Sequence, residues 1–99
     1  MDQDLRPGAI VSSLRGRDAG GYYIVLGTDG EYADIADGRL RRAEKPKKKK
    51  RKHMLLVDFV DPAIAARISE GIKLTNNEIR KALAAFAAAQ DDREYSETT

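Results

Sequence analysis

The sequence predicts a mainly β fold followed by C-terminal α structure: a small five-stranded antiparallel barrel and then a two-helix appendage. Two observations carry this prediction. As far as residue 60, short apolar segments of strand length alternate with glycine turns roughly every ten residues. Beyond that point the apolar residues recur at helical spacing. The chain has 99 residues, a length typical of a single domain.

Five segments have the composition of strands, and turn signals separate them. Pro7-Gly8, the glycine-rich residues 16–21, Asp29-Gly30 and Asp37-Gly38 mark turns, because glycine adopts a positive φ without a steric penalty. The predicted strands are residues 9–11, 22–26, 32–36, 39–42 and 54–57. Together they define a barrel domain at residues 5–60, which includes a basic loop at residues 42–53.

Residues 61–90 are expected to form the two helices. Asp61 and Pro62 suit the N-cap and the first helical position, and Gly71 suits a helix end. A capping box from Thr75 to Glu78 begins the second helix. We expect residues 91–99 to form a flexible polar tail.

The second helix carries one apolar face, made of Ile79, Leu83 and Phe86. A lone short helix is marginal in water. We therefore expect this face to pack against Ile64 and Ile68, against the barrel, or against a second copy of the chain.

Positive charge is concentrated in one segment. Residues 39–52 contain ten lysines and arginines against Glu44 alone, a charge of +9, so the remainder of the +2 chain carries −7. Pro46 and mutual repulsion predict that residues 42–53 form an extended, solvated loop. Such a segment binds phosphates by releasing counterions, which gives salt-sensitive and largely sequence-independent affinity. A charged loop without a partner and a nuclear import signal at residues 46–52 stay open as alternatives.

Several classes of function are disfavoured by composition. The chain has no cysteine and one histidine, which excludes disulfides, thiol nucleophiles and multi-histidine metal sites. No convincing pair of carboxylates or Ser-His-Asp arrangement is evident, so we expect no enzyme activity, no cofactor and no small-molecule substrate. There is no apolar run of roughly 20 residues and no secretory signal, and we expect a cytoplasmic protein without membrane contact.

Several of these segments together resemble a known family. Residues 8–11, 16–20 and 24–26, with residues 37–42 and 52–54, are similar to the KOW motif of a bacterial RNA-binding family. That family is related to the L-fourteen-e type of large-subunit ribosomal protein. The resemblance implies an SH3-like barrel that binds RNA, as a ribosomal or ribosome-associated protein acting in translation. It also implies that the loop from Ser13 to Gly21 approaches the RNA.

Charge and resemblance together define the predicted RNA-binding residues. They are Arg15, Arg17, Arg39, Arg41, Arg42, Lys45, Lys47, Lys48, Lys49, Lys50, Arg51, Lys52 and His53. Gly16, Asp18 and Gly20 are expected to shape the first loop, with Gly20 at positive φ. Tyr22, Tyr23 and Tyr32 are either core residues or base-stacking residues, and at least one of the adjacent pair faces the core.

A different class of function stays open. SH3-like barrels also bind proteins, and the face of Ile79, Leu83 and Phe86 is suited to a partner groove. The alternative is therefore a protein-interaction module. The sequence leaves the oligomeric state and the identity of the RNA undetermined.

Overall fold

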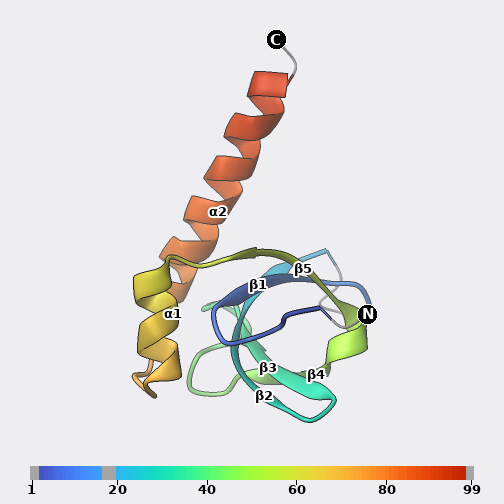
Figure 1. Ribbon diagram of the computed structural model, residues 1–99, viewed down its shortest axis with the longest axis vertical. Coiled ribbons are helices and arrows are strands. Elements are labelled where there is room, and N and C mark those ends of the chain that lie inside the picture. The colour runs from blue at the N-terminus through green and yellow to red at the C-terminus, as the bar shows by residue number, and fades with distance from the viewer. Residues whose placement is uncertain (1–2, 17–19, 98–99) are drawn as a thin grey trace.

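The chain forms one five-stranded antiparallel sheet and two C-terminal helices (Figure 1). The computed structural model describes residues 3–16 and 20–97, with residues 91–97 described by their backbone alone. The elements are β1 (Ala9–Ser13), β2 (Tyr22–Asp29), β3 (Tyr32–Ala36), β4 (Lys47–Lys50), the 3-10 turn η2 (Arg51–His53), β5 (Met54–Phe59), α1 (Pro62–Ser69) and α2 (Asn76–Glu97). The strand order is β4-β3-β2-β1-β5. The expected mixture of strands first and helices last is confirmed.

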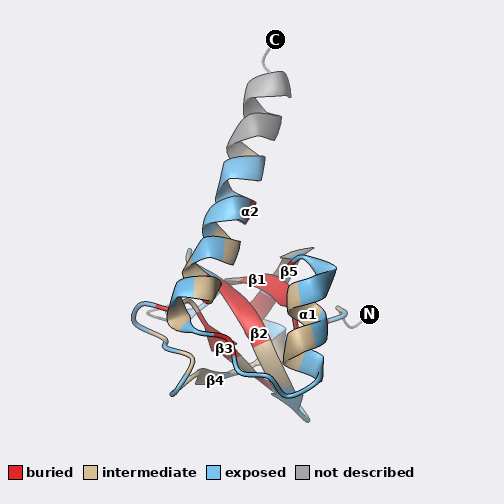
Figure 2. Ribbon diagram, turned by 90° about the vertical axis from the view of Figure 1, so that its left-hand side faces the viewer, coloured by how far each residue is buried: buried red, intermediate tan, exposed pale blue. Residues whose placement is uncertain are grey.

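The central strands bury both of their faces (Figure 2). Successive side chains of a strand point to opposite faces, so Val11 and Val25 enter an interior cluster while Ile10 and Ile24 enter an outer one. The interior cluster comprises Leu5, Ala9, Val11, Tyr23, Val25, Ala33, Ile35 and Met54. The outer cluster comprises Ile10, Ile24, Ala36, Val60, Leu74, Ile79 and Phe86.

The prediction of a strand at residues 39–42 is wrong, and so is the prediction that residues 42–53 are all loop. The fourth strand is β4, whose four lysines pair with β3 in a register that places Lys47 opposite Ile35 and Lys50 opposite Tyr32. Aliphatic lysine stems lie along apolar surface while their charges stay in water. Lys48 also gains two carboxylate neighbours, with its Nζ 3.4 Å from Asp29 Oδ2 and 3.8 Å from Asp34 Oδ1.

The sheet curls into a barrel-like shape but remains open, which corrects the expectation of a closed barrel. Among the described residues, β4 and β5 form the two edges of the sheet and do not pair. Register shifts at Ile10/Val11 and between Val25 and Gly27 allow the bending, since bulges increase local twist. Near the edge strand β5, the Gln3 carboxamide donates to Met54 O at 2.7 Å and accepts from Leu56 N at 2.5 Å.

The helix boundaries follow the predicted signals. Asp61 Oδ1 accepts from Ala63 N at 2.8 Å, and Pro62 is the first residue of α1. After α1, the Gly71 and Ile72 amides donate to the Ile68 and Arg67 carbonyls at 3.0 and 2.9 Å, which is a Schellman ending.

The capping box is also present at the start of α2. Glu78 N donates to Thr75 Oγ1 at 3.1 Å, and Thr75 N donates to Glu78 Oε1 at 3.0 Å. Glu78 is hydrogen-bonded to Arg67 of α1 as well. The Arg67 hydrogen bond, with help from the Thr75 backbone, lowers the pKa of Glu78 to about 2, so this link between the two helices remains charged in mild acid.

The apolar face of α2 packs on the sheet, as one of the expected arrangements. Ile79 and Phe86 are buried with Ile10 and Ile24, and Leu83, Ile64 and Ile68 border the same cluster. The ring of Tyr22 meets Phe86 edge-on with 5.1 Å between centroids, while Tyr23 is buried in the interior cluster. The expectation that one of these two tyrosines faces the interior core is confirmed.

The second helix extends beyond residue 90, where the sequence predicted that it would end. The backbone of α2 remains helical through Glu97 and projects away from the sheet (Figure 1). Residues 90–94, Gln-Asp-Asp-Arg-Glu, contain neither Gly nor Pro, so their backbone is free to continue the helix. Within the described part of the chain, no helix has the length and apolar composition to cross a bilayer.

Phe86 is 6% exposed, and its truncation should leave a cavity between α2 and the sheet. We expect Phe86→Ala to lower the free energy of unfolding by about 3 kcal/mol. Urea denaturation of this variant against Ile72→Ala, which truncates an exposed side chain, measures the difference. Equal stability of the two variants would contradict the packing of α2 on the sheet.

Candidate nucleic-acid interface

Basic side chains from separate segments meet where the loop after β1 approaches β4 and η2. Lys49 Nζ donates to the Arg15 carbonyl at 2.7 Å, and Leu14 N donates to the His53 carbonyl at 2.9 Å. These bonds join the loop after β1 both to β4 and to the last residue of η2. We call Arg15, Lys49, Lys50, Lys52 and His53 the basic cluster.

The ring of His53 responds to this concentration of charge. Desolvation lowers the pKa of His53, and repulsion from Arg15, Lys52, Lys49 and Lys50 lowers it further. The imidazole is therefore neutral at pH 7, a form in which one ring nitrogen is a potential donor and the other a potential acceptor. The positive potential of the cluster disfavours one more cation and favours an anion.

The four lysines of β4 are not equivalent. Opposed residues of an antiparallel pair project to the same face, so Lys47 and Lys49 share the interior face with Ile35 and Ala33. Lys48 and Lys50 lie on the opposite face, where Lys48 is paired with Asp29 and Asp34. The sequence alone does not distinguish these lysines, whereas the fold separates them by face and places carboxylates beside Lys48.

A shallow pocket adjoins the basic cluster at the turn between β2 and β3. Gly30, Glu31, Lys50, Arg51 and Lys52 line a volume of about 320 Å³. The Arg51 amide donates to the Glu31 carbonyl at 2.8 Å and fixes one wall. Three cations against one carboxylate make this a suitable seat for a phosphate group.

The loop after β1 has the expected turn geometry where it is described. Gly16 and Gly20 have φ values of +78° and +86°, so the expectation of a positive φ at Gly20 is confirmed. Gly20 N donates to Ser13 O at 3.1 Å and closes the loop at its base. Arg17 and Asp18, both predicted to act here, lie outside the described residues.

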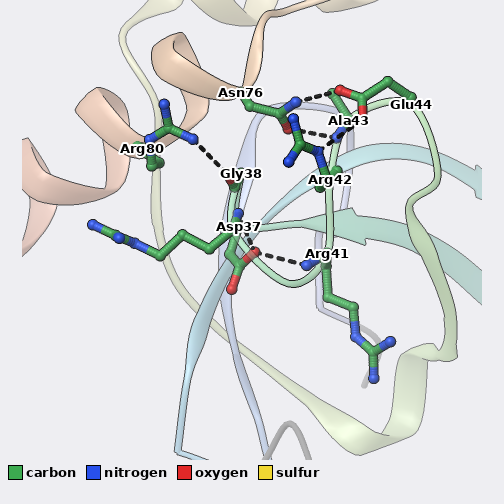
Figure 3. A network of polar contacts seen from close by, with 9 residues as sticks. Asp37, Gly38, Arg41, Arg42, Ala43, Glu44, Asn76 and Arg80 are labelled. Atoms are coloured by element: carbon green, nitrogen blue, oxygen red, sulfur yellow. Dashed lines mark hydrogen bonds and ion pairs between the residues drawn. The ribbon is translucent and has the colours of Figure 1, made fainter.

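The remaining predicted cations lie elsewhere, in the loop between β3 and β4. Arg39, Arg41, Arg42 and Lys45 follow β3, and the loop docks on the first turns of α2 (Figure 3). Arg42 Nε is 3.0 Å from Glu44 Oε2, so one of these cations has a carboxylate neighbour. The structure therefore separates nine of the predicted RNA-binding residues into the basic cluster and this second group, while Lys47 and Lys48 lie in β4 and Arg51 lines the neighbouring pocket.

Two residues of α2 position the second group, and sequence reasoning missed both. Asn76 Oδ1 accepts from Ala43 N at 2.7 Å, and its amide nitrogen donates to Glu44. Arg80 donates to the Gly38 carbonyl at 2.6 Å. At Gly38, which has φ +78°, a Cβ would lie 2.5 Å from Asn76 O, so the turn requires glycine for both conformation and space. The sequence indicated where α2 begins, but it did not indicate that the first turns of α2 hold the loop between β3 and β4.

Comparison with known proteins gives no assignment for this arrangement. No protein-family model matches the chain, and no curated protein matches its sequence.

Asn76 and Asn77 offer a matched pair of substitutions at the start of α2. Asn76→Ala removes both bonds to the loop without changing charge, and we expect a loss of about 1 kcal/mol in the free energy of unfolding and faster hydrogen exchange at Ala43 N. Asn77 is exposed, so Asn77→Ala should alter neither quantity. Unchanged exchange at Ala43 in the first variant would contradict the docking of the loop.

Proposed function

We propose that this protein is a non-catalytic RNA-binding protein, ribosomal or ribosome-associated, built on an SH3-like barrel of the KOW type. The basic cluster contacts RNA phosphates, and the loops of the sheet set the position of the RNA. The five antiparallel strands, the interior core and the positive-φ glycines of the first loop support the proposed kinship. The observation that carries the function is the meeting of Arg15 with Lys49, Lys50 and Lys52 around a His53 whose pKa is lowered.

RNA suits this surface better than a generic acidic partner does. Phosphates repeated along a chain match cations repeated along β4 and η2. Tyr32 is partly exposed and directly opposes Lys50 in the sheet. An aromatic ring beside a phosphate contact provides a surface on which an unpaired base stacks.

The rival interpretation, a protein-interaction module, depended on the apolar face of α2. That face already packs within the fold, because Ile79 and Phe86 are buried against the sheet. The specific surface that favoured a partner groove is therefore occupied by the chain itself.

Salt dependence tests the proposed phosphate contacts. With roughly four contacts, the slope of log K against log salt concentration should be about −3 for single-stranded RNA, and Lys52→Gln should flatten it by about 0.7. Lys73→Gln makes the same charge change at an exposed site between α1 and α2 and should leave the slope unchanged. Fluorescence anisotropy titrations with both variants measure the slopes.

The two variants separate local contact from overall charge. Equal flattening by Lys52→Gln and Lys73→Gln would reduce the effect to net charge and contradict the proposed interface. Weak, salt-independent association of the wild-type protein with RNA would contradict the proposed function as a whole.

RNA binding should also be coupled to protonation of His53. A phosphate that approaches the basic cluster offsets the repulsion that lowers the pKa of His53 in the free protein, so the complex takes up a proton. Affinity should then rise as pH falls from 7 to 5.5, by at most tenfold per pH unit. His53→Gln should bind RNA with no such pH dependence beyond that of the RNA itself. A retained pH dependence in His53→Gln would place the proton elsewhere.

A further inference from the structure

The loop between β3 and β4 holds an apolar side chain out in water at its tip. Leu40 is 91% exposed, whereas the next most exposed large hydrophobic residue among those whose side chains the structure describes, Leu14, is 53% exposed. Single exposed leucines are common on protein surfaces. The unusual feature here is that several hydrogen bonds fix the backbone around Leu40.

Residues on both sides of Leu40 are clamped by Asp37. Its Oδ1 accepts from Arg39 N at 2.8 Å and from Arg41 N at 3.0 Å. The Arg41 carbonyl in turn accepts from Asp37 N at 2.9 Å and Gly38 N at 3.1 Å. The tip is thus a closed turn whose two arms are tied to one carboxylate and one carbonyl.

The closed turn is itself fixed to the body of the protein. Arg80 holds the Gly38 carbonyl, and Asn76 holds Ala43 and Glu44 (Figure 3). The entropy of ordering this loop is therefore spent on folding rather than on binding, which favours affinity for a ligand that fits. A preorganised turn that exposes leucine between arginines has the character of a recognition element.

We propose that Leu40 packs on the face of an unpaired RNA base while the neighbouring arginines lie near the phosphates of the same strand. This inference rests on the proposed RNA-binding function and adds a second contact that the basic cluster does not make. An aliphatic side chain gains nothing from a phosphate, but it gains from the apolar face of a base. In a regular duplex those faces are stacked, whereas a bulge or loop exposes them.

The charge around Leu40 favours RNA over a protein as the occupant. Residues 37–46 contain four cations and two carboxylates, and Arg39 is exposed beside Leu40. A nucleotide presents an apolar face and an anion within the reach of adjacent side chains, and this loop presents the complementary pair. The basic cluster contacts phosphates whether or not the RNA is folded. Leu40 would therefore supply the preference for folded RNA with unpaired bases.

Two RNA hairpins that differ by one bulged adenosine test the inference. We expect the wild-type protein to bind the bulged hairpin about tenfold more tightly, a ratio within reach of burying most of one leucine side chain. Leu40→Ala should bring the ratio close to one while keeping the salt slope of the wild type. Ile72→Ala, which truncates an exposed aliphatic residue between the helices, should keep the tenfold ratio.

The outcomes distinguish this inference from the function on which it rests. Steeply salt-dependent binding of both hairpins with equal affinity leaves the proposed function standing and overturns the role of Leu40. An undiminished ratio in Leu40→Ala does the same. If neither hairpin binds, both proposals fail together. Because Leu40 makes no buried contact, circular dichroism of the variant should match the wild type, and the affinity change then reports on the RNA contact alone.

Discussion

The fold depends on the burial of both faces of β1 and β2. Adjacent residues such as Ile10 and Val11 belong to different apolar clusters, so the central residues of these two strands are shielded from solvent on both faces. The curl of the sheet encloses one face, and the helices must cover the other. Removal of α2 would expose Ile24 and its neighbours, which makes the helices structural partners of the sheet. The sheet is thus held between its enclosed core and the helices, and this arrangement determines where the loops lie.

Folding also redistributes the charge that the sequence concentrates. Ten cations lie within residues 39–52, yet β4 points alternate lysines to opposite faces, and the loop that carries the preceding arginines docks beside α2. Some of these cations therefore lie near Arg15, which comes from a distant segment, whereas others flank the turn that Asp37 fixes. Two basic surfaces of different character result, one dense in lysine and one that combines arginine with an exposed aliphatic group.

Much of the architecture could be predicted from local signals. Asp61, Gly71 and the Thr75–Glu78 capping box act through bonds within a few residues of each other, and such rules are visible in sequence. The register of β4 was not visible, because pairing with β3 outweighs the poor strand composition of four lysines. The prediction of a strand at residues 39–42 is wrong for the opposite reason. These residues alternate as a strand would, but the backbone amides of Arg39 and Arg41 donate to the Asp37 carboxylate instead of to a neighbouring strand.

The candidate site was predictable in composition but not in arrangement. The density of lysine indicated an anionic partner, whereas the contact of Lys49 with Arg15 and that of Arg80 with Gly38 join residues 34 and 42 positions apart. Contacts over such separations arise from tertiary packing, which a pattern within one segment does not encode. The roles of Asn76 and Arg80 belong to this class.

The placement of lysines on an edge strand has a consequence for the protein at high concentration. An uncovered strand edge is a template on which further chains can assemble. At one edge of this sheet, Gln3 already occupies the Met54 carbonyl and the Leu56 amide. At the other edge, two copies approaching through β4 would bring two rows of lysine together, and their repulsion opposes growth of a continuous sheet. The lysines of the edge strand β4 thereby also disfavour aggregation of the protein.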